Sequence, residues 1–199
     1  MNEFTRKQIE KAKEKIPSSV AMRQKKRLMN EIENYDSGDV DTIWEISRLL
    51  YFFVGFGKGS KTGLQTGEML IERQEAKDNG VQYTPSGDHP NTPQTQIAFL
   101  FLHRDMFLVD TPESDLAFYD FYCYCNLIIE TTSEQGKILS KFSKRDKSST
   151  YTLDPIERYQ HLMDSNKMKL FGHKGKLTKF PIDYYNKEHK KYLQNKKVL

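Results

Sequence analysis

The most apolar stretch of the chain covers residues 112–131 and reads PESDLAFYDFYCYCNLIIET. Aromatic and aliphatic side chains fall on every side of a helix drawn through it, which is typical of a helix buried at the centre of a bundle. A strand over 115–129 fits less well, because Asp115, Asp120 and Asn126 interrupt the required alternation. The segment therefore predicts one long buried helix.

Further helices are predicted on both sides of this segment. Three begin at a capping residue followed by proline, at 92–93, 111–112 and 154–155. Others follow from helical spacing or good helix formers, over 3–16, 18–35, 43–53 and 62–77. We therefore expect a mainly α fold: a single compact multi-helix domain around a buried aromatic helix.

Two short segments have the pattern of a β-hairpin, one over 138–153 and the other over 168–180. The second signal is stronger, because Gly172 and Gly175 bound a tight turn between two strand-like runs. The chain is accordingly divided into three parts by prediction. These are a basic N-terminal helical segment (1–36), a helical core domain (37–166), and a basic hairpin and tail (167–199).

Charge is segregated along the chain. Residues 1–30 carry nine Lys or Arg against three Asp or Glu, residues 31–135 carry six against eighteen, and residues 136–199 carry sixteen against six. The formal net charge of +4 therefore hides two basic ends around an acidic, apolar middle. Because local charge decides where a polyanion binds, the basic ends favour contact with nucleic acid. The acidic middle of the chain is a second possible partner for these basic ends, in competition with nucleic acid.

Lysine outnumbers arginine by 23 to 8. Lysine is a flexible point charge that suits phosphate, whereas arginine supplies the fork that reads guanine. We therefore expect a non-enzymatic, nucleic-acid-associated protein that contacts the phosphate backbone of DNA or RNA with little sequence specificity. The alternative is an interaction or assembly protein, of a kind found in viruses and mobile elements, whose basic ends dock on acidic protein surfaces. A homo-oligomer is compatible with both hypotheses.

The candidate nucleic-acid-binding residues are basic side chains near the two ends and in the segment before residue 150. They are Arg23, Lys25, Lys26, Arg27, Lys144, Arg145, Lys147, Lys174, Lys176, Lys179, Lys190 and Lys191. Arg23, Lys26 and Arg27 share one face of their predicted helix at i, i+3 and i+4. Aromatic residues alternate with lysines beyond residue 167, and aromatic rings stack on bases.

Residues 55–62 read GFGKGSKT and resemble the Walker A loop of P-loop nucleotide-binding proteins, with Ser60 in place of its last glycine. Residues 106–112, MFLVDTP, resemble the strand and aspartate of P-loop GTPases, with Glu113 where that family has glycine. The resemblance implies a third hypothesis, a degenerate nucleotide-binding enzyme in which Lys61 and Thr62 hold phosphate. An ordinary glycine-rich turn between helices is the competing interpretation.

No complete catalytic or metal-binding motif occurs, so we expect no catalytic residue, metal or cofactor. Arg158 and His161 lie three residues apart and are interpreted as a surface or semi-buried pair. Cys123 and Cys125 are predicted to be free core thiols, because residues two apart do not readily form a disulfide. The apolar runs are shorter than the roughly 18 residues of a membrane span, so we expect no membrane partner. The N-terminus lacks the apolar stretch of a signal peptide, so we expect a cytoplasmic or host-cytoplasmic protein.

Overall fold

The chain is α/β, with helices arranged around a five-stranded mixed sheet, so the prediction of a mainly α fold is wrong. The computed structural model describes residues 1–31, 59–142 and 156–183. The described helices are α1 (Glu3–Lys13), α2 (Ser18–Glu31), α4 (Gly67–Asp78), α5 (Pro93–Leu102), α6 (Arg104–Phe107), α7 (Pro112–Cys125), α8 (Ser133–Lys141) and α9 (Glu157–Asp164). The described strands are β1 (Ser60–Thr66), β2 (Ser86–Asp88), β3 (Leu127–Thr131), β4 (Leu170–Gly172) and β5 (Gly175–Leu177).

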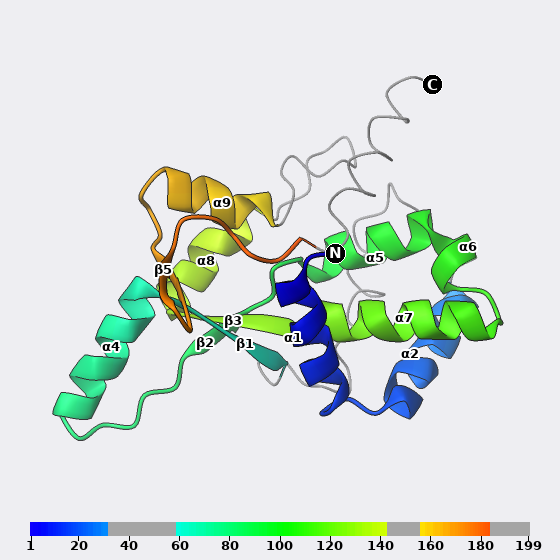
Figure 1. Ribbon diagram of the computed structural model, residues 1–199, viewed down its shortest axis with the longest axis horizontal. Helices are drawn as coiled ribbons and strands as arrows, with labels where there is room; N and C mark the ends of the chain where they lie inside the picture. The colour runs from blue at the N-terminus through cyan, green and yellow to red at the C-terminus, as the bar shows by residue number, and fades with distance from the viewer. Residues whose placement is uncertain (32–58, 143–155, 184–199) are drawn as a thin grey trace.

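The strand order in the sheet is β2-β3-β1-β4-β5. The central pair, β1 and β3, is parallel, and the three other pairs are antiparallel. In Figure 1 the sheet occupies the middle of the molecule, α2, α5, α6 and α7 gather at one end, and α8 and α9 lie at the other. Helix α1 contacts both central strands and α7, while α4 projects away from the sheet.

The predicted long helix over 112–131 is in fact a helix followed by a strand. Helix α7 ends at Cys125, and after Asn126 the chain continues as β3. All five residues of β3 are buried: the strand lies between β1 and β2 in the sheet, and α1 and α4 pack against it. A strand that is buried on both faces shows no alternation of apolar and polar residues. Because that alternation is the usual sequence signal for a strand, the sequence did not predict β3.

Residues 62–77 were predicted to be helical throughout, and their first part is instead strand β1. The core-facing positions of β1 are Ser60, Thr62, Leu64 and Thr66. Three of these four side chains carry hydroxyl groups, so the strand shows no apolar alternation in sequence. The helix α4 begins only at Gly67.

The weaker hairpin prediction, over 138–153, is also wrong in its first arm. Residues 133–141 form α8, which begins with a capping box between Thr132 and Gln135. The side chains of these two residues bond each other's backbone amides, and this satisfies two donors at the helix start. The stronger prediction, over 168–180, corresponds to the antiparallel pair β4 and β5.

Two predicted helix starts are confirmed. Helix α5 begins at Pro93 and α7 at Pro112. The Thr111 side chain accepts a hydrogen bond from the Ser114 amide at 3.2 Å, as expected of an N-cap. The helix predicted over 43–53 and the tail beyond 183 lie outside the described residues.

The core forms around α7. Phe118, Phe121 and Tyr122 are almost fully buried, and the Phe121 ring lies 5.1 Å from that of Phe107 and 5.7 Å from that of Phe99, centroid to centroid. Cys123 and Cys125 are free and buried, as predicted, and burial raises the pKa of Cys123 to about 12. None of the helices in the described ranges combines the length and the hydropathy of a membrane-spanning segment.

Candidate polyanion-binding surface

Lys25, a candidate phosphate ligand, is buried inside the molecule. Its side chain extends from α2 toward the start of α7 and is 3% exposed. The ammonium group donates to the Val109 carbonyl at 2.7 Å, to Ser114 Oγ at 3.0 Å and to Asp115 Oδ1 at 2.5 Å. An ammonium group has three N–H donors, so these three acceptors satisfy it completely. Lys25 is therefore not available to an external phosphate.

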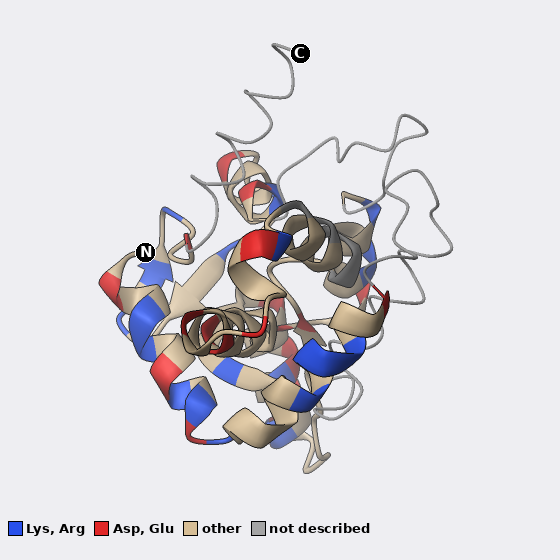
Figure 2. Cartoon of the chain, turned by 90° about the vertical axis from the view of Figure 1, so that its right-hand side faces the viewer, with Lys and Arg blue, Asp and Glu red and all other residues tan. Residues whose placement is uncertain are grey.

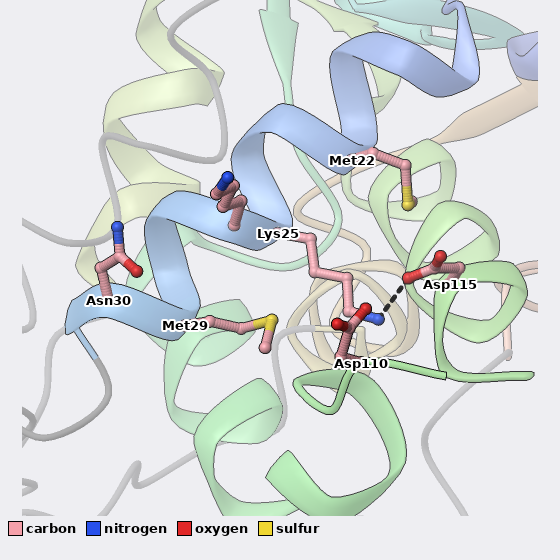
Figure 3. Close-up of a pocket in the computed structure, with 7 residues that line it drawn as sticks. Met22, Lys25, Met29, Asn30, Asp110 and Asp115 are labelled. Atoms are coloured by element: carbon pink, nitrogen blue, oxygen red, sulfur yellow. Dashed lines mark hydrogen bonds and ion pairs between the residues drawn. The ribbon is translucent and has the colours of Figure 1, made fainter. Parts of the chain in front are cut away.

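A pocket of about 370 Å³ opens beside Lys25, and Met22 and Met29 flank the lysine there (Figure 3). The charged side chains that line it are Lys25, Lys26, Asp110 and Asp115. Two lysines and two aspartates cancel in formal charge, so this pocket presents no cationic surface to a polyanion.

A second basic residue of the N-terminal segment pairs with the acidic middle. Lys13 on α1 lies 2.6 Å from Asp120 on α7 and 2.9 Å from Glu10. Burial by itself lowers the pKa of Lys13, but the hydrogen bonds to these two carboxylates outweigh it and raise the pKa above its usual range. Figure 2 shows α7 end-on between α1 and α2, which both carry basic residues. The N-terminal segment therefore docks on the acidic middle of its own chain.

The other basic residues of α2 lie on the surface. Arg23, Lys26 and Arg27 are all exposed, as the predicted shared face requires. Lys25, between them in sequence, belongs to the buried face of the same helix together with Ala21 and Leu28. The N-terminal part of the predicted site is thus split between surface and interior.

The basic residues of the C-terminal hairpin point to solvent. Lys174 lies in the turn, Lys176 pairs with Phe171 across the hairpin, and Lys179 follows β5; all three are exposed. Gly175 permits this turn because its φ of +101° is a conformation that side chains rarely adopt. Leu170 is fully buried, which attaches the hairpin to the core and leaves its lysines outside.

Two further lysines belong to the same surface and were not among the selected site residues. Lys167 and Lys169 precede β4 and are exposed. Among the described residues, none of the five lysines from Lys167 to Lys179 forms an ion pair with an acidic side chain. Their alternation with Met168 and Leu170 was a usable signal, because residues two apart in extended chain share a face. We call these five residues the hairpin lysines.

Lys61 and Thr62 do not occupy a phosphate-binding loop. Both lie within β1, where Lys61 Nζ is 2.7 Å from Glu130 Oε1 and the Thr62 hydroxyl donates to the Ile128 carbonyl at 2.9 Å. A Walker A loop instead joins a strand to a helix N-terminus. Gly59 also has a packing role, because a Cβ there would lie 2.4 Å from the Asn126 carbonyl oxygen. This geometry does not support the P-loop resemblance.

A charged cluster lies beside Lys61 on the sheet. The Glu130 carboxylate accepts hydrogen bonds from Lys61 and Gln65, each at 2.7 Å, and lies 3.4 Å from Arg73 on α4. Burial alone raises the pKa of Glu130, but these donors outweigh it and hold the pKa below its usual value. The cluster joins β1, β3 and α4, and its cations are engaged with a buried carboxylate.

Arg158 and His161 do not form the surface or semi-buried pair that was predicted. His161 is exposed and packs edge-on against Phe142, whereas Arg158 is 1% exposed. The difference arises because Arg158, Tyr159 and Leu162 define the buried face of α9, and His161 lies at its margin. The three-residue spacing of Arg158 and His161 in sequence does not show where the buried face of the helix ends.

Arg158 is the centre of a buried polar network. Its guanidinium donates to Asp88 Oδ2 at 2.5 Å, to the His89 carbonyl at 2.7 Å and to the Leu139 carbonyl at 2.8 Å. The Tyr159 hydroxyl donates to the same Asp88 carboxylate. Burial raises the pKa of Asp88, and Arg158 opposes that shift. Burial also lowers the pKa of the His89 imidazole, to about 4.

The remaining candidates lie outside the described residues: Lys144, Arg145, Lys147, Lys190 and Lys191. Within the described ranges, no group of three or more His, Cys, Asp or Glu side chains has the arrangement of a metal site. Comparisons of the chain with protein-family models, with curated proteins and with solved structures found no match.

Proposed function

We propose that this protein binds the phosphate backbone of nucleic acid through the hairpin lysines. The supporting observation is the contrast between two lysines of the N-terminal segment and the hairpin lysines. Lys13 and Lys25 are paired with carboxylates of α7, whereas the hairpin lysines are exposed and have no acidic partner among the described residues. Five like charges on one short segment repel one another, and a polyanion relieves that repulsion. A cytoplasmic location is part of this proposal.

Contact through lysine defines the kind of binding. Lysine approaches phosphate as a point charge and carries no bidentate fork for a base edge. We therefore expect similar affinity for different sequences and a steep dependence on salt, because bound phosphates release counterions. For single strands each neutralised phosphate contributes about −0.7 to the slope of log K against log salt concentration. Five contacts then lower the affinity about 100-fold between 50 and 200 mM salt.

The experiment is a fluorescence-anisotropy titration of labelled single-stranded oligonucleotides over a series of NaCl concentrations. Replacing Lys174, Lys176 and Lys179 by Gln together is expected to reduce the slope by about 2. The matched control replaces Lys11, Lys77 and Lys141 by Gln, since these exposed lysines lie on three different helices and the net charge changes equally. The control is expected to keep most of the slope.

Two results would contradict the proposal. One is the absence of binding by the parent protein at 50 mM salt. The other is an equal loss of affinity in the hairpin variant and the control, because the net charge of the chain would then explain binding without any defined surface. Salt-dependent self-association without nucleic-acid binding would instead favour the assembly hypothesis.

A further inference from the structure

A small pocket lies between the end of α9 and the hairpin. Its volume is about 160 Å³, and its polar lining consists of Asn166, Lys169, Lys176 and Thr178. Met168 and Leu177 form apolar parts of the same wall. The pocket thus joins two of the hairpin lysines to two uncharged hydrogen-bonding side chains.

The local backbone explains why the two lysines meet here. Asn166 adopts a φ of 55° after the last turn of α9, and the amides of Lys167 and Met168 both bond to the Leu162 carbonyl. A left-handed residue at this position reverses the chain after a helix, and Asn tolerates it better than most residues. The buried Met168 side chain then anchors the reversed segment, and Lys169 follows directly.

The hairpin register brings in the second lysine. Lys176 pairs with Phe171, and Lys169 lies two residues before Phe171 on the same face. Lys169 and Lys176 are therefore diagonal neighbours, with Cβ atoms roughly 7 Å apart, within reach of two long side chains. Neither ammonium has an acidic partner among the described residues, so the concave volume between them is cationic.

Charge identifies the anion that fits best. A terminal phosphomonoester carries about −1.5 to −2 at neutral pH, which matches two ammonium groups, whereas a phosphodiester inside a strand carries −1. A pocket also admits the end of a strand more readily than a continuous backbone, which must enter and leave. The Asn166 amide and the Thr178 hydroxyl supply further donors for phosphate oxygens. The C-terminal end of α9 lies nearby and carries a partial negative charge that disfavours an anion. Both lysines are therefore needed to make the pocket attractive to phosphate.

We propose that the Lys169–Lys176 pocket holds the terminal phosphate of a nucleic-acid strand. This inference rests on the proposed function, because it assigns to the hairpin lysines a preference among nucleic acids. It divides the hairpin in two: Lys169 and Lys176 recognise the strand end, and Lys174 contributes general backbone attraction from the turn.

The test compares oligonucleotides of one sequence that carry a 5′-phosphate, a 3′-phosphate or hydroxyls at both ends, at pH 7.5 and 100 mM salt. The parent protein is expected to prefer one phosphorylated end about tenfold, the ratio that corresponds to one additional charge-assisted contact. Lys169→Gln and Lys176→Gln should each reduce this ratio to below about twofold. Lys174→Gln, the control within the same hairpin, should weaken all three ligands equally and keep the ratio.

The outcomes separate the two proposals. Equal affinity of the parent for phosphorylated and hydroxyl ends overturns the pocket assignment and leaves backbone binding in place. The pocket assignment is also overturned if the Lys169→Gln and Lys176→Gln variants both keep the parent's ratio of affinities for phosphorylated and hydroxyl ends. If none of the three ligands binds at 100 mM salt, the titration is repeated at 50 mM, and absence of binding there removes the proposed function itself. Competition by inorganic phosphate should reduce the preference in the parent and have no effect on the ratio in the Lys176→Gln variant.

Discussion

Replacing Arg158 by Met is expected to destabilise the protein strongly. Arg158 is 1% exposed, and its guanidinium donates to three acceptors from two places in the chain: the Asp88 carboxylate and the His89 carbonyl, which are adjacent, and the Leu139 carbonyl. Met preserves much of the side-chain volume but leaves these acceptors without their donor. Removing one partner of a buried ion pair typically costs about 3–5 kcal/mol. For a domain with a free energy of unfolding of about 5–15 kcal/mol, this is a large fraction.

The loss should also depend on pH, through Asp88. Burial already raises the pKa of Asp88, and loss of the Arg158 charge raises it further. A carboxyl group with a raised folded-state pKa contributes stability below its unfolded pKa and loses it as the pH rises through the folded value. The stability gap between the parent and Arg158→Met is therefore expected to widen as the pH increases.

Urea unfolding at pH 5 and pH 8, followed by circular dichroism, measures both effects. Asp88→Asn in the Arg158→Met background is the companion variant, since it removes the carboxylate that would be left unpaired. The double variant should recover about 1–3 kcal/mol relative to the sum of the single changes. A cost below about 1 kcal/mol for Arg158→Met, or a gap that narrows with pH, would refute this reasoning.

Two other substitutions test the assignments made above. Lys25→Met should lower the free energy of unfolding by about 2 kcal/mol, because Ser114 and the Val109 carbonyl lose a donor while the half-exposed Asp115 is rehydrated. The affinity of this variant for oligonucleotides, measured by anisotropy, should stay within twofold of that of the parent. A larger loss of affinity would show that Lys25 belongs to the binding surface. His89→Gln should remove a pH dependence of stability. The folded pKa of His89 is about 4, below the ordinary value near 6.5, so its contribution to stability is fully present above the unfolded pKa and is lost as the pH falls toward the folded pKa. From this group the parent is expected to lose about 2 to 3 kcal/mol of unfolding free energy between pH 7.5 and 4.5. Unfolding titrations at those two pH values check this, and an unchanged loss in the variant would assign it to other groups.

The helices could be predicted where local chemistry alone decides them. Thr111 and Pro112 mark the start of α7 because capping and the fixed φ of proline are properties of adjacent residues. The two strands β1 and β3 could not be predicted, because β3 is buried on both faces and β1 places Ser and Thr toward the core. Their strand character depends on pairing with each other across more than sixty residues of chain, and no local window contains that information.

The candidate site divides in the same way. Composition located the basic segments, and the two glycines of the hairpin predicted its turn. Whether a given lysine is exposed depends on which helix face meets the core, and neighbours in sequence can differ completely. Lys25 and Lys26 are adjacent, yet one is enclosed by α7 and the other lies on the surface.

The sequence by itself therefore determined the local features: helix starts, the hairpin turn and the segregation of charge. These depend on the backbone preferences and charges of residues close together in the chain. Only the tertiary structure decided the α/β architecture, the docking of the N-terminal segment on α7 and the meeting of Lys169 with Lys176. The physical reason is that burial, ion pairing and strand pairing are interactions between distant residues, and their energies exist only once the chain has brought those residues together.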